Sequence, residues 1–308
     1  MSHPGDPRPG ASGPGAAGPW TRGPGDAARE FPQDADRAAT APGDAAPGDT
    51  ARESSAPGGA DDRRAALARN LAAVRARISA ACAAAGRDEA GLTLIAVTKT
   101  YPASDVLALA GLGLTDFGEN RDQEAAPKAA EVGGQAVRWH FIGQLQTNKA
   151  RSVARYASVV QSVDRIRLAR ALGAAARAAG RELCCLVQVS LDPAVYGGPP
   201  GPGRDGGEHP EQARGGVPPA RLVEVAAAID AEEGLTLGGL MAVAPLGGDP
   251  AAAFAPLRRL SDAVRSVRPS ATVISAGMSG DLEAAIVSGA THLRIGTALL
   301  GNRRLPVR

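Results

Sequence analysis

The chain has 308 residues, of which 44% are hydrophobic and 21% are charged, as in an ordinary globular protein. The net charge is only +2 and aromatic residues make up 3%, so the composition gives no electrostatic or stacking basis for binding nucleic acid or an anionic membrane. No apolar run approaches the length of a membrane span, and the N-terminus lacks the apolar core of a secretion signal. We therefore expect a cytoplasmic protein.

Two segments have the composition of disordered chain. Residues 1–60 are rich in Pro, Gly, Ala, Asp and Arg and have almost no large apolar side chains, so burial cannot offset the entropy of ordering them. We predict a disordered tail over 1–60 and one folded domain over 61–308. Residues 192–216 are also polar and rich in Gly and Pro, which predicts a flexible insertion; a lid over the active-site face is the alternative.

Helical and strand patterns alternate after the tail. Apolar residues recur at helical spacing from Leu67 to Cys82, and Gly86 follows as a stop. The run that ends at Lys99 is too short for a buried helix and lies between Gly91 and Pro102, which predicts a strand. The expected strands are 94–99, 115–120, 138–143, 158–164, 183–191, 235–242, 272–277 and 292–297.

This alternation predicts the fold class. About eight strands alternating with helices over roughly 240 residues are typical of an α/β protein with a single (β/α)8 TIM barrel. A doubly wound open sheet is the alternative, but it usually has fewer strands, and no G-x-G-x-x-G follows the first strand.

Lys99 ends the first expected strand, where functional residues of TIM barrels are concentrated. Removal from water would favour the uncharged amine, the nucleophile that forms a Schiff base with a carbonyl. The alternative is a lysine whose stem lies along the barrel mouth while its ammonium reaches solvent. Position alone does not decide between the two.

A candidate phosphate site follows the last two strands. Small residues precede a helix in Ser275–Asp281, and free backbone N–H groups at such a turn can bind an anion. In Arg294–Thr297, Gly296 permits close backbone approach and the Thr297 hydroxyl can donate a hydrogen bond. Loops after strands seven and eight form the usual phosphate site of this fold, although each taken singly is also an ordinary tight turn.

Barrel closure would bring these features together. Strand eight would lie beside strand one, and Lys99 therefore beside the phosphate site. An amine in that position points either to pyridoxal 5'-phosphate (PLP) or to a phosphorylated carbonyl substrate.

Three further polar residues lie on the expected strands. Arg294 shares a strand face with Gly296 and, if buried, needs an acceptor, which the PLP ring nitrogen or an unidentified carboxylate would supply. An always-charged Arg would keep that nitrogen unprotonated. Asn120 would hydrogen-bond the cofactor or cap the next helix. We interpret His140 as a satisfied core histidine rather than a catalytic base.

Six motifs in chain order resemble the pyridoxal phosphate homeostasis protein family, also called proline synthetase co-transcribed homologues. HFIG-x-LQ-x-NK and GMS…RIGT are specific in combination, and the resemblance covers most of residues 65–304. The tail and the long loop after the fifth strand depart from the family pattern, with Gly215-Gly-Val217 as a remnant of the family's short turn. The motifs are AVTK ending at Lys99, FGEN (Phe117–Asn120), WHFIGQLQTNK (Trp139–Lys149), GLMA (Gly239–Ala242), GMS (Gly277–Ser279) and RIGTALLG (Arg294–Gly301).

The resemblance implies an alanine-racemase-like barrel of the fold type III PLP group, with Lys99 as the Schiff-base lysine. It also implies phosphate contacts from the Ser279 and Gly296–Thr297 regions. The expected cofactor-binding residues are Lys99, Asn120, Met278, Ser279, Arg294, Gly296 and Thr297.

We interpret the chain as a carrier or buffer in PLP homeostasis, without a dedicated catalytic activity, with PLP-dependent apoenzymes as candidate partners and a monomer favoured. An amino-acid racemase of the same barrel group is the enzymatic alternative. Racemases append a β-domain that supplies a tyrosine base, and the chain ends at Arg308, soon after the last expected strand. A Schiff-base aldolase would need an acid or base beside Lys99, which the sequence does not identify.

Overall fold

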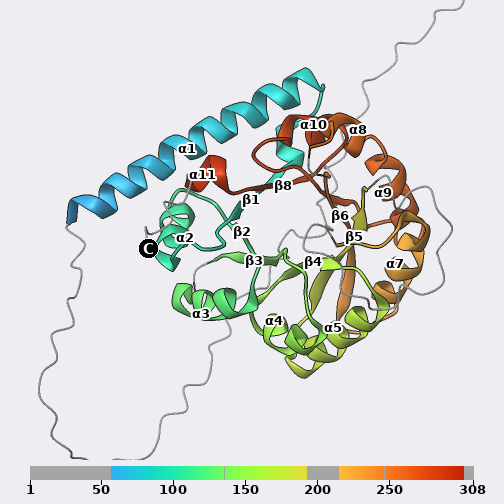
Figure 1. Ribbon diagram of the computed structural model, residues 1–308. Coiled ribbons are helices and arrows are strands. Elements are labelled where there is room, and N and C mark those ends of the chain that lie inside the picture. Colours follow the sequence, from blue (N-terminus) through green and yellow to red (C-terminus); the bar gives the residue numbers. More distant parts are fainter. Residues whose placement is uncertain (1–56, 135, 193–214, 246, 302–308) are drawn as a thin grey trace, which may run out of the picture. The chain divides into compact units, whose positions relative to one another are not determined.

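The computed structural model describes residues 57–134, 136–192, 215–245 and 247–301. Within them, eight parallel strands pair in chain order and β1 also pairs with β8, which closes the sheet into a barrel (Figure 1). The predicted TIM barrel is therefore confirmed. The strands are β1 (Thr93–Val97), β2 (Asp116–Glu119), β3 (Arg138–Phe141), β4 (Val159–Val163), β5 (Leu183–Ser190), β6 (Leu235–Val243), β7 (Val273–Ser275) and β8 (His292–Ile295).

Each expected strand overlaps an observed one, although several ends differ by one or two residues, and two of these differences concern expected site residues. Lys99 lies two residues beyond the end of β1, in a turn. Thr297 was expected in the last strand and instead begins helix α11. Both differences lie at the C-terminal ends of strands, where the chain leaves the sheet to form the loops of the barrel mouth.

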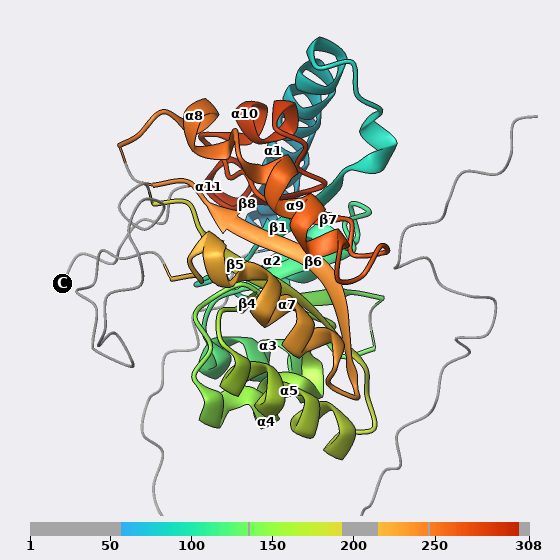
Figure 2. The same ribbon diagram turned by 90° about the vertical axis from the view of Figure 1, so that its right-hand side faces the viewer.

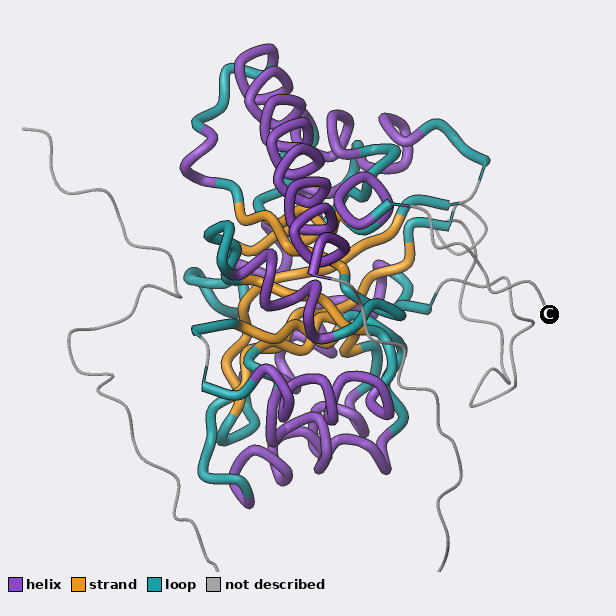
Figure 3. Tube along the Cα trace, turned by 90° about the vertical axis from the view of Figure 1, so that its left-hand side faces the viewer, coloured by secondary structure: helices purple, strands orange, loops and turns teal. Residues whose placement is uncertain are grey.

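Helices surround the strands, and the longest of the described helices, α1, crosses the front of the view in Figure 3 (Figures 1–3). Among them, none combines the length and the apolar character that a bilayer crossing requires. The helices are α1 (Pro57–Ala84), α2 (Ala103–Ala110), α3 (Asp122–Val132), α4 (Ala150–Tyr156), α5 (Ile166–Ala178), α7 (Leu222–Asp230), α8 (Pro250–Phe254), α9 (Leu257–Arg265), α10 (Leu282–Val287) and α11 (Thr297–Leu300).

The main hydrophobic core lies between the outer face of the barrel and the helices. In α9, for example, Leu257, Leu260 and Val264 recur at helical spacing and are all buried. Strand β5 is buried along its whole length, because helices cover one of its faces and the barrel interior the other. Burial on both faces explains why its sequence reads as a continuous run rather than an alternation.

Helix α1 begins earlier than expected. It starts at Pro57, inside the segment predicted as tail, and residues 1–56 lie outside the described part of the chain. Its apolar side buries Leu67 and Cys82 against α2, α10 and α11. Gly86 ends it with a φ of 61°, and the N–H of Arg87 bonds back to the carbonyl of Cys82 at 2.9 Å. The predicted stop at Gly86 is confirmed.

The expected insertion at 192–216 is described only at its ends, since residues 193–214 lie outside the described chain. The returning segment pairs with the end of β5. The N–H of Val217 bonds to the carbonyl of Gln188, and the carbonyl of Val217 accepts from the N–H of Ser190, both at 2.9 Å. Gly216 has a φ of 137°, and a Cβ there would fall 2.7 Å from the Ser190 nitrogen. A glycine is needed where this segment meets the strand.

Candidate functional site

Lys99 lies in a tight turn at the mouth of the barrel. The N–H of Tyr101 bonds to the carbonyl of Thr98 at 3.1 Å, which closes the turn around Lys99 and Thr100. Thr100 has a φ of 68°, a strained conformation for a β-branched residue and one that recurs at functional sites. The Lys99 side chain is exposed, so the removal from water that we expected from the sequence is not seen.

A buried ion pair holds the residue before Lys99. Lys128 of α3 lies 2.6 Å from Glu119 at the end of β2 and donates a hydrogen bond of 2.8 Å to the carbonyl of Thr98. The Thr98 hydroxyl donates to the same Glu119 oxygen at 2.7 Å. Burial raises the pKa of Glu119, although the hydrogen bonds from Lys128 and Thr98 oppose the rise. This pair was not predicted from the sequence, where its only signal was Glu119 within the FGEN motif.

The loops after β7 and β8 meet beside β1. The Ser279 hydroxyl oxygen accepts from the N–H of Ala298 at 3.2 Å, which joins the two loops directly. A Cβ on Gly296 would fall 3.5 Å from the Val97 side chain, two residues before Lys99. The structure therefore brings Ser279, Gly296 and the Lys99 turn to the same part of the barrel mouth, as barrel closure predicted.

Met278 and Thr297 flank this meeting point. The N–H of Met278 bonds to the carboxylate of Asp281 at 2.5 Å, and the Met278 side chain is partly buried. Thr297 is the first residue of α11 and is exposed. Both expected site residues thus belong to the two loops that Ser279 and Ala298 join.

Arg294 lies inside the barrel on β8, beside Ile95 of β1. It is buried and donates to the Ser275 hydroxyl at 2.7 Å and to the carbonyl of Ala242 at 2.9 Å. Its strand leads directly to Gly296, so its guanidinium lies in the barrel interior below the meeting point of the loops. Ser275 and its role as an acceptor for Arg294 were not anticipated, because strand order does not show which interior side chains touch.

Asn120 follows β2 and does not cap the next helix, because the N-cap position of α3 is occupied by Arg121. The loop after β3 passes directly against it. A Cβ on Gly143 would fall 2.0 Å from the Asn120 carbonyl oxygen and 2.5 Å from its side-chain oxygen. This close approach is the physical reason for the glycine in the HFIG motif.

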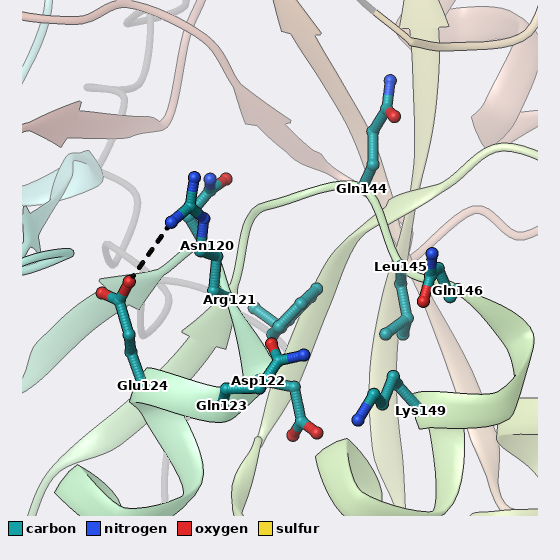
Figure 4. Close-up of a pocket in the computed structure, with 10 residues that line it drawn as sticks. Asn120, Arg121, Asp122, Gln123, Glu124, Gln144, Leu145, Gln146 and Lys149 are labelled. Atoms are coloured by element: carbon teal, nitrogen blue, oxygen red, sulfur yellow. Dashed lines mark ion pairs between the residues drawn. The ribbon is translucent and has the colours of Figure 1, made fainter. Parts of the chain in front are cut away.

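Asn120 also borders a cavity of about 520 Å³ between the ends of β2 and β3 (Figure 4). Lys149 of the HFIGQLQTNK motif and Gln144 lie on one side, and the ion pair between Arg121 and Glu124 lies on the other, at 3.7 Å. Lys99 and the loops after β7 and β8 are not among its lining residues. The cavity therefore adjoins the Lys99 turn at Glu124, which accepts from the Thr100 N–H at 3.1 Å, but does not coincide with it.

His140 is a satisfied core histidine, as predicted. Its ring is buried, with Nε2 2.8 Å from the Asp116 carboxylate and Nδ1 3.0 Å from the Gln161 amide nitrogen. It lies near the N-terminal end of the barrel, since Asp116 is the first residue of β2. We assign it no direct contact with a ligand at the mouth.

The chain is similar to proteins that carry the same barrel. The family model of the alanine racemase N-terminal domain matches residues 64–304. Pyridoxal phosphate homeostasis proteins from Mycobacterium bovis and Escherichia coli are 43% and 36% identical to the chain, across 79% and 77% of its length and 95% and 97% of theirs.

Solved structures of related proteins have the same barrel fold. PipY of Synechococcus elongatus with PLP bound aligns with a TM-score of 0.62 at 32% identity, over 76% of this chain and all of PipY (100%). Alanine racemase from Streptomyces lavendulae aligns with a TM-score of 0.58 over 79% of this chain and 58% of its own, but at 19% identity it shows the shared fold alone. The domain match and the homeostasis proteins cover nearly the whole described barrel. The chain therefore belongs to the pyridoxal phosphate homeostasis protein family.

Proposed function

We propose that the chain binds pyridoxal 5'-phosphate through Lys99 and serves as a cytoplasmic carrier or buffer of this cofactor. The observation that carries the proposal is the meeting of three features at the barrel mouth. The Lys99 turn, the joined loops of Ser279 and Gly296, and the buried guanidinium of Arg294 all lie on β1, β7 and β8 or directly after them. A family relative, PipY, has been solved with PLP bound.

The residues present fit the chemical groups of the cofactor. A primary amine, backbone N–H groups with hydroxyls, and a guanidinium match an aldehyde, a phosphate and a ring nitrogen, respectively. Bound PLP supplies the aldehyde, which condenses with a lysine amine to a Schiff base with loss of water. Lys99 is exposed and is not held in the buried ion pair that occupies Lys128. It is therefore the amine that a ligand at the mouth can reach.

The remaining site residues have assigned roles in the proposal. Ser279 and Thr297 donate hydrogen bonds to the phosphate, and Gly296 allows the backbone to approach it. Met278 would contact the cofactor from the loop after β7. Arg294 donates to the ring nitrogen and, because it stays charged, keeps that nitrogen unprotonated. Asn120 would hydrogen-bond the cofactor.

A carrier must hold the cofactor without using it. An Arg partner weakens the ring as an electron sink, which disfavours chemistry on bound amino acids. The exposure of the Lys99 turn favours exchange of the cofactor with solvent or with an apoenzyme. We therefore propose PLP-dependent apoenzymes as the recipients.

Titration and transfer test this function. The apo-protein should gain a visible absorbance band on addition of PLP and should restore activity to a PLP-dependent apoenzyme. Lys99→Ala should lose the band and transfer less cofactor, whereas Lys149→Ala, at a lysine in the adjacent cavity, should behave like the parent chain. Wild-type protein that neither binds PLP nor restores the apoenzyme would contradict the proposal.

A further inference from the structure

A chain of buried side chains crosses the interior of the barrel. Arg294 donates to the Ser275 hydroxyl at 2.7 Å, and that hydroxyl donates to the Gln161 side-chain oxygen at 2.8 Å. The Gln161 amide nitrogen lies 3.0 Å from Nδ1 of His140, whose Nε2 lies 2.8 Å from Asp116. The five residues come from β8, β7, β4, β3 and β2. Because β4 and β7 are not neighbours in the sheet, the contact between Gln161 and Ser275 must pass through the barrel interior.

The groups at the two ends, Arg294 and Asp116, fix the direction of every hydrogen bond between them. A guanidinium has only donors and a carboxylate only acceptors. Ser275 accepts from Arg294, so its single hydrogen points onward to Gln161. The Gln161 amide must then donate to His140, which leaves the His140 Nδ1 unprotonated and its Nε2–H directed at Asp116. Every hydrogen therefore points from Arg294 toward Asp116.

The surroundings support this arrangement. All five residues are buried, so solvent does not compete for these hydrogen bonds. Burial alone would raise the pKa of Asp116, but the hydrogen bond from His140 and the charge of Arg138 hold it well below its usual range. Burial lowers the pKa of His292 to about 3, so this second ring, 6.5 Å from His140, is uncharged near neutral pH.

We propose that Asp116, His140, Gln161 and Ser275 are positioning residues, which hold the Arg294 guanidinium in one orientation and keep His140 as the Nε2–H tautomer. The ligand side of this inference rests on the proposed function, because the group that Arg294 would meet is the cofactor ring nitrogen. The row of hydrogen bonds from Arg294 to Asp116 is made by protein side chains alone, so it can be tested without ligand. A guanidinium held in one orientation would meet the ring nitrogen in one geometry, whereas a mobile guanidinium would meet it in many.

Nitrogen-15 NMR of the apo-protein tests the chain directly. The His140 Nδ1 should show the shift of an unprotonated nitrogen and Nε2 that of an N–H. Gln161→Glu should change this pattern, because a carboxylate cannot donate to Nδ1 and favours a ring protonated on both nitrogens. A wild-type His140 that carries its proton on Nδ1, or on both nitrogens at neutral pH, would overturn the inference whether or not PLP binds.

A matched serine pair tests the positioning of Arg294. Ser275→Ala removes the hydroxyl that accepts a hydrogen bond from Arg294. Ser162→Ala removes a buried hydroxyl that has no hydrogen-bond partner among the described residues. In the apo-protein, the Arg294 N–H signals should be separate and slow to exchange in wild type and Ser162→Ala, and averaged in Ser275→Ala.

The same pair separates this inference from the proposed function. Ser275→Ala should bind PLP about tenfold more weakly, with a shifted absorbance maximum, as expected when a hydrogen bond to a charged group is lost. Melting curves and Gln161→Leu, which interrupts the chain at another residue, control for misfolding. Ser275→Ala that matches Ser162→Ala in both the Arg294 signals and PLP binding overturns the positioning role. Failure of wild type to bind PLP would contradict only the proposed function.

Discussion

The ammonium group of Lys128 donates a hydrogen bond of 2.8 Å to the backbone carbonyl of Thr98, the residue that precedes Lys99. Glu124, one helical turn earlier on the same helix α3, accepts a hydrogen bond from the Thr100 N–H at 3.1 Å. The exposed Lys99 side chain therefore extends from a backbone that α3 holds at the residue before it and at the residue after it. This explains how a strained Thr100 persists at the end of β1.

The buried ion pair between Lys128 and Glu119 predicts that one substitution will lower the stability of the protein strongly. Lys128→Met leaves the Glu119 carboxylate buried without its partner and should reduce the free energy of unfolding by about 3–5 kcal/mol. The double variant Lys128→Met/Glu119→Leu removes both charges and should recover most of that loss. Urea unfolding monitored by circular dichroism measures both. A single-variant loss below about 1 kcal/mol, the range of an exposed pair, would show that the pair is not buried in solution.

The close approach at Gly143 predicts strain from one methyl group. Gly143→Ala places a Cβ 2.0 Å from the Asn120 carbonyl, so the loop after β3 must shift, at a cost of about 1–3 kcal/mol. PLP affinity should also fall, because Asn120 moves with the loop. Gly91→Ala is the matched control, since a methyl group on Gly91 would meet nothing within 4 Å. Equal melting temperatures for the two variants would contradict the observed packing.

His292 predicts a loss of stability in acid. Its pKa is lowered by burial from 6.5 to about 3, so between these values the unfolded chain binds a proton that the folded chain does not. Stability should be complete above pH 6.5 and fall as the pH drops toward 3, by up to about 1.4 kcal/mol per pH unit for this one group. Asp116, with its lowered pKa, adds to the loss below pH 3.8.

Urea unfolding at a series of pH values measures this dependence. His292→Gln removes the titrating ring and should flatten the curve between pH 6.5 and 4. A wild-type curve that is level across this interval, or a variant with the same slope as wild type, would argue that His292 is protonated in the folded state.

The barrel was predictable because its strands are short apolar runs buried on both faces, of which β5 is the clearest. The proximity of Gly296 to Val97, two residues before Lys99, followed from closure alone, since β8 must lie beside β1. These features depend on strand order, which the sequence shows directly.

Other features depend on how elements are rotated and packed. The pairing of Lys128 with Glu119 requires a particular face of α3 to meet β2, and the contact of Gln161 with Ser275 joins strands on different sides of the barrel. Neither follows from local pattern. The start of helix α1 was predicted too late. Its first turns, from Pro57, lack the large apolar residues from which the helix was predicted.

Reduction of the PLP-loaded protein with borohydride fixes the cofactor to the lysine that holds it. The sequence contains only three lysines, Lys99, Lys128 and Lys149, so peptide mapping by mass spectrometry assigns the attachment without ambiguity. We predict that the cofactor mass is found on the peptide carrying Lys99, is retained in Lys149→Arg and is lost in Lys99→Ala. Cofactor attached to Lys128 or Lys149 in the wild-type protein, or a label that survives in Lys99→Ala, would show that Lys99 is not the lysine that binds PLP.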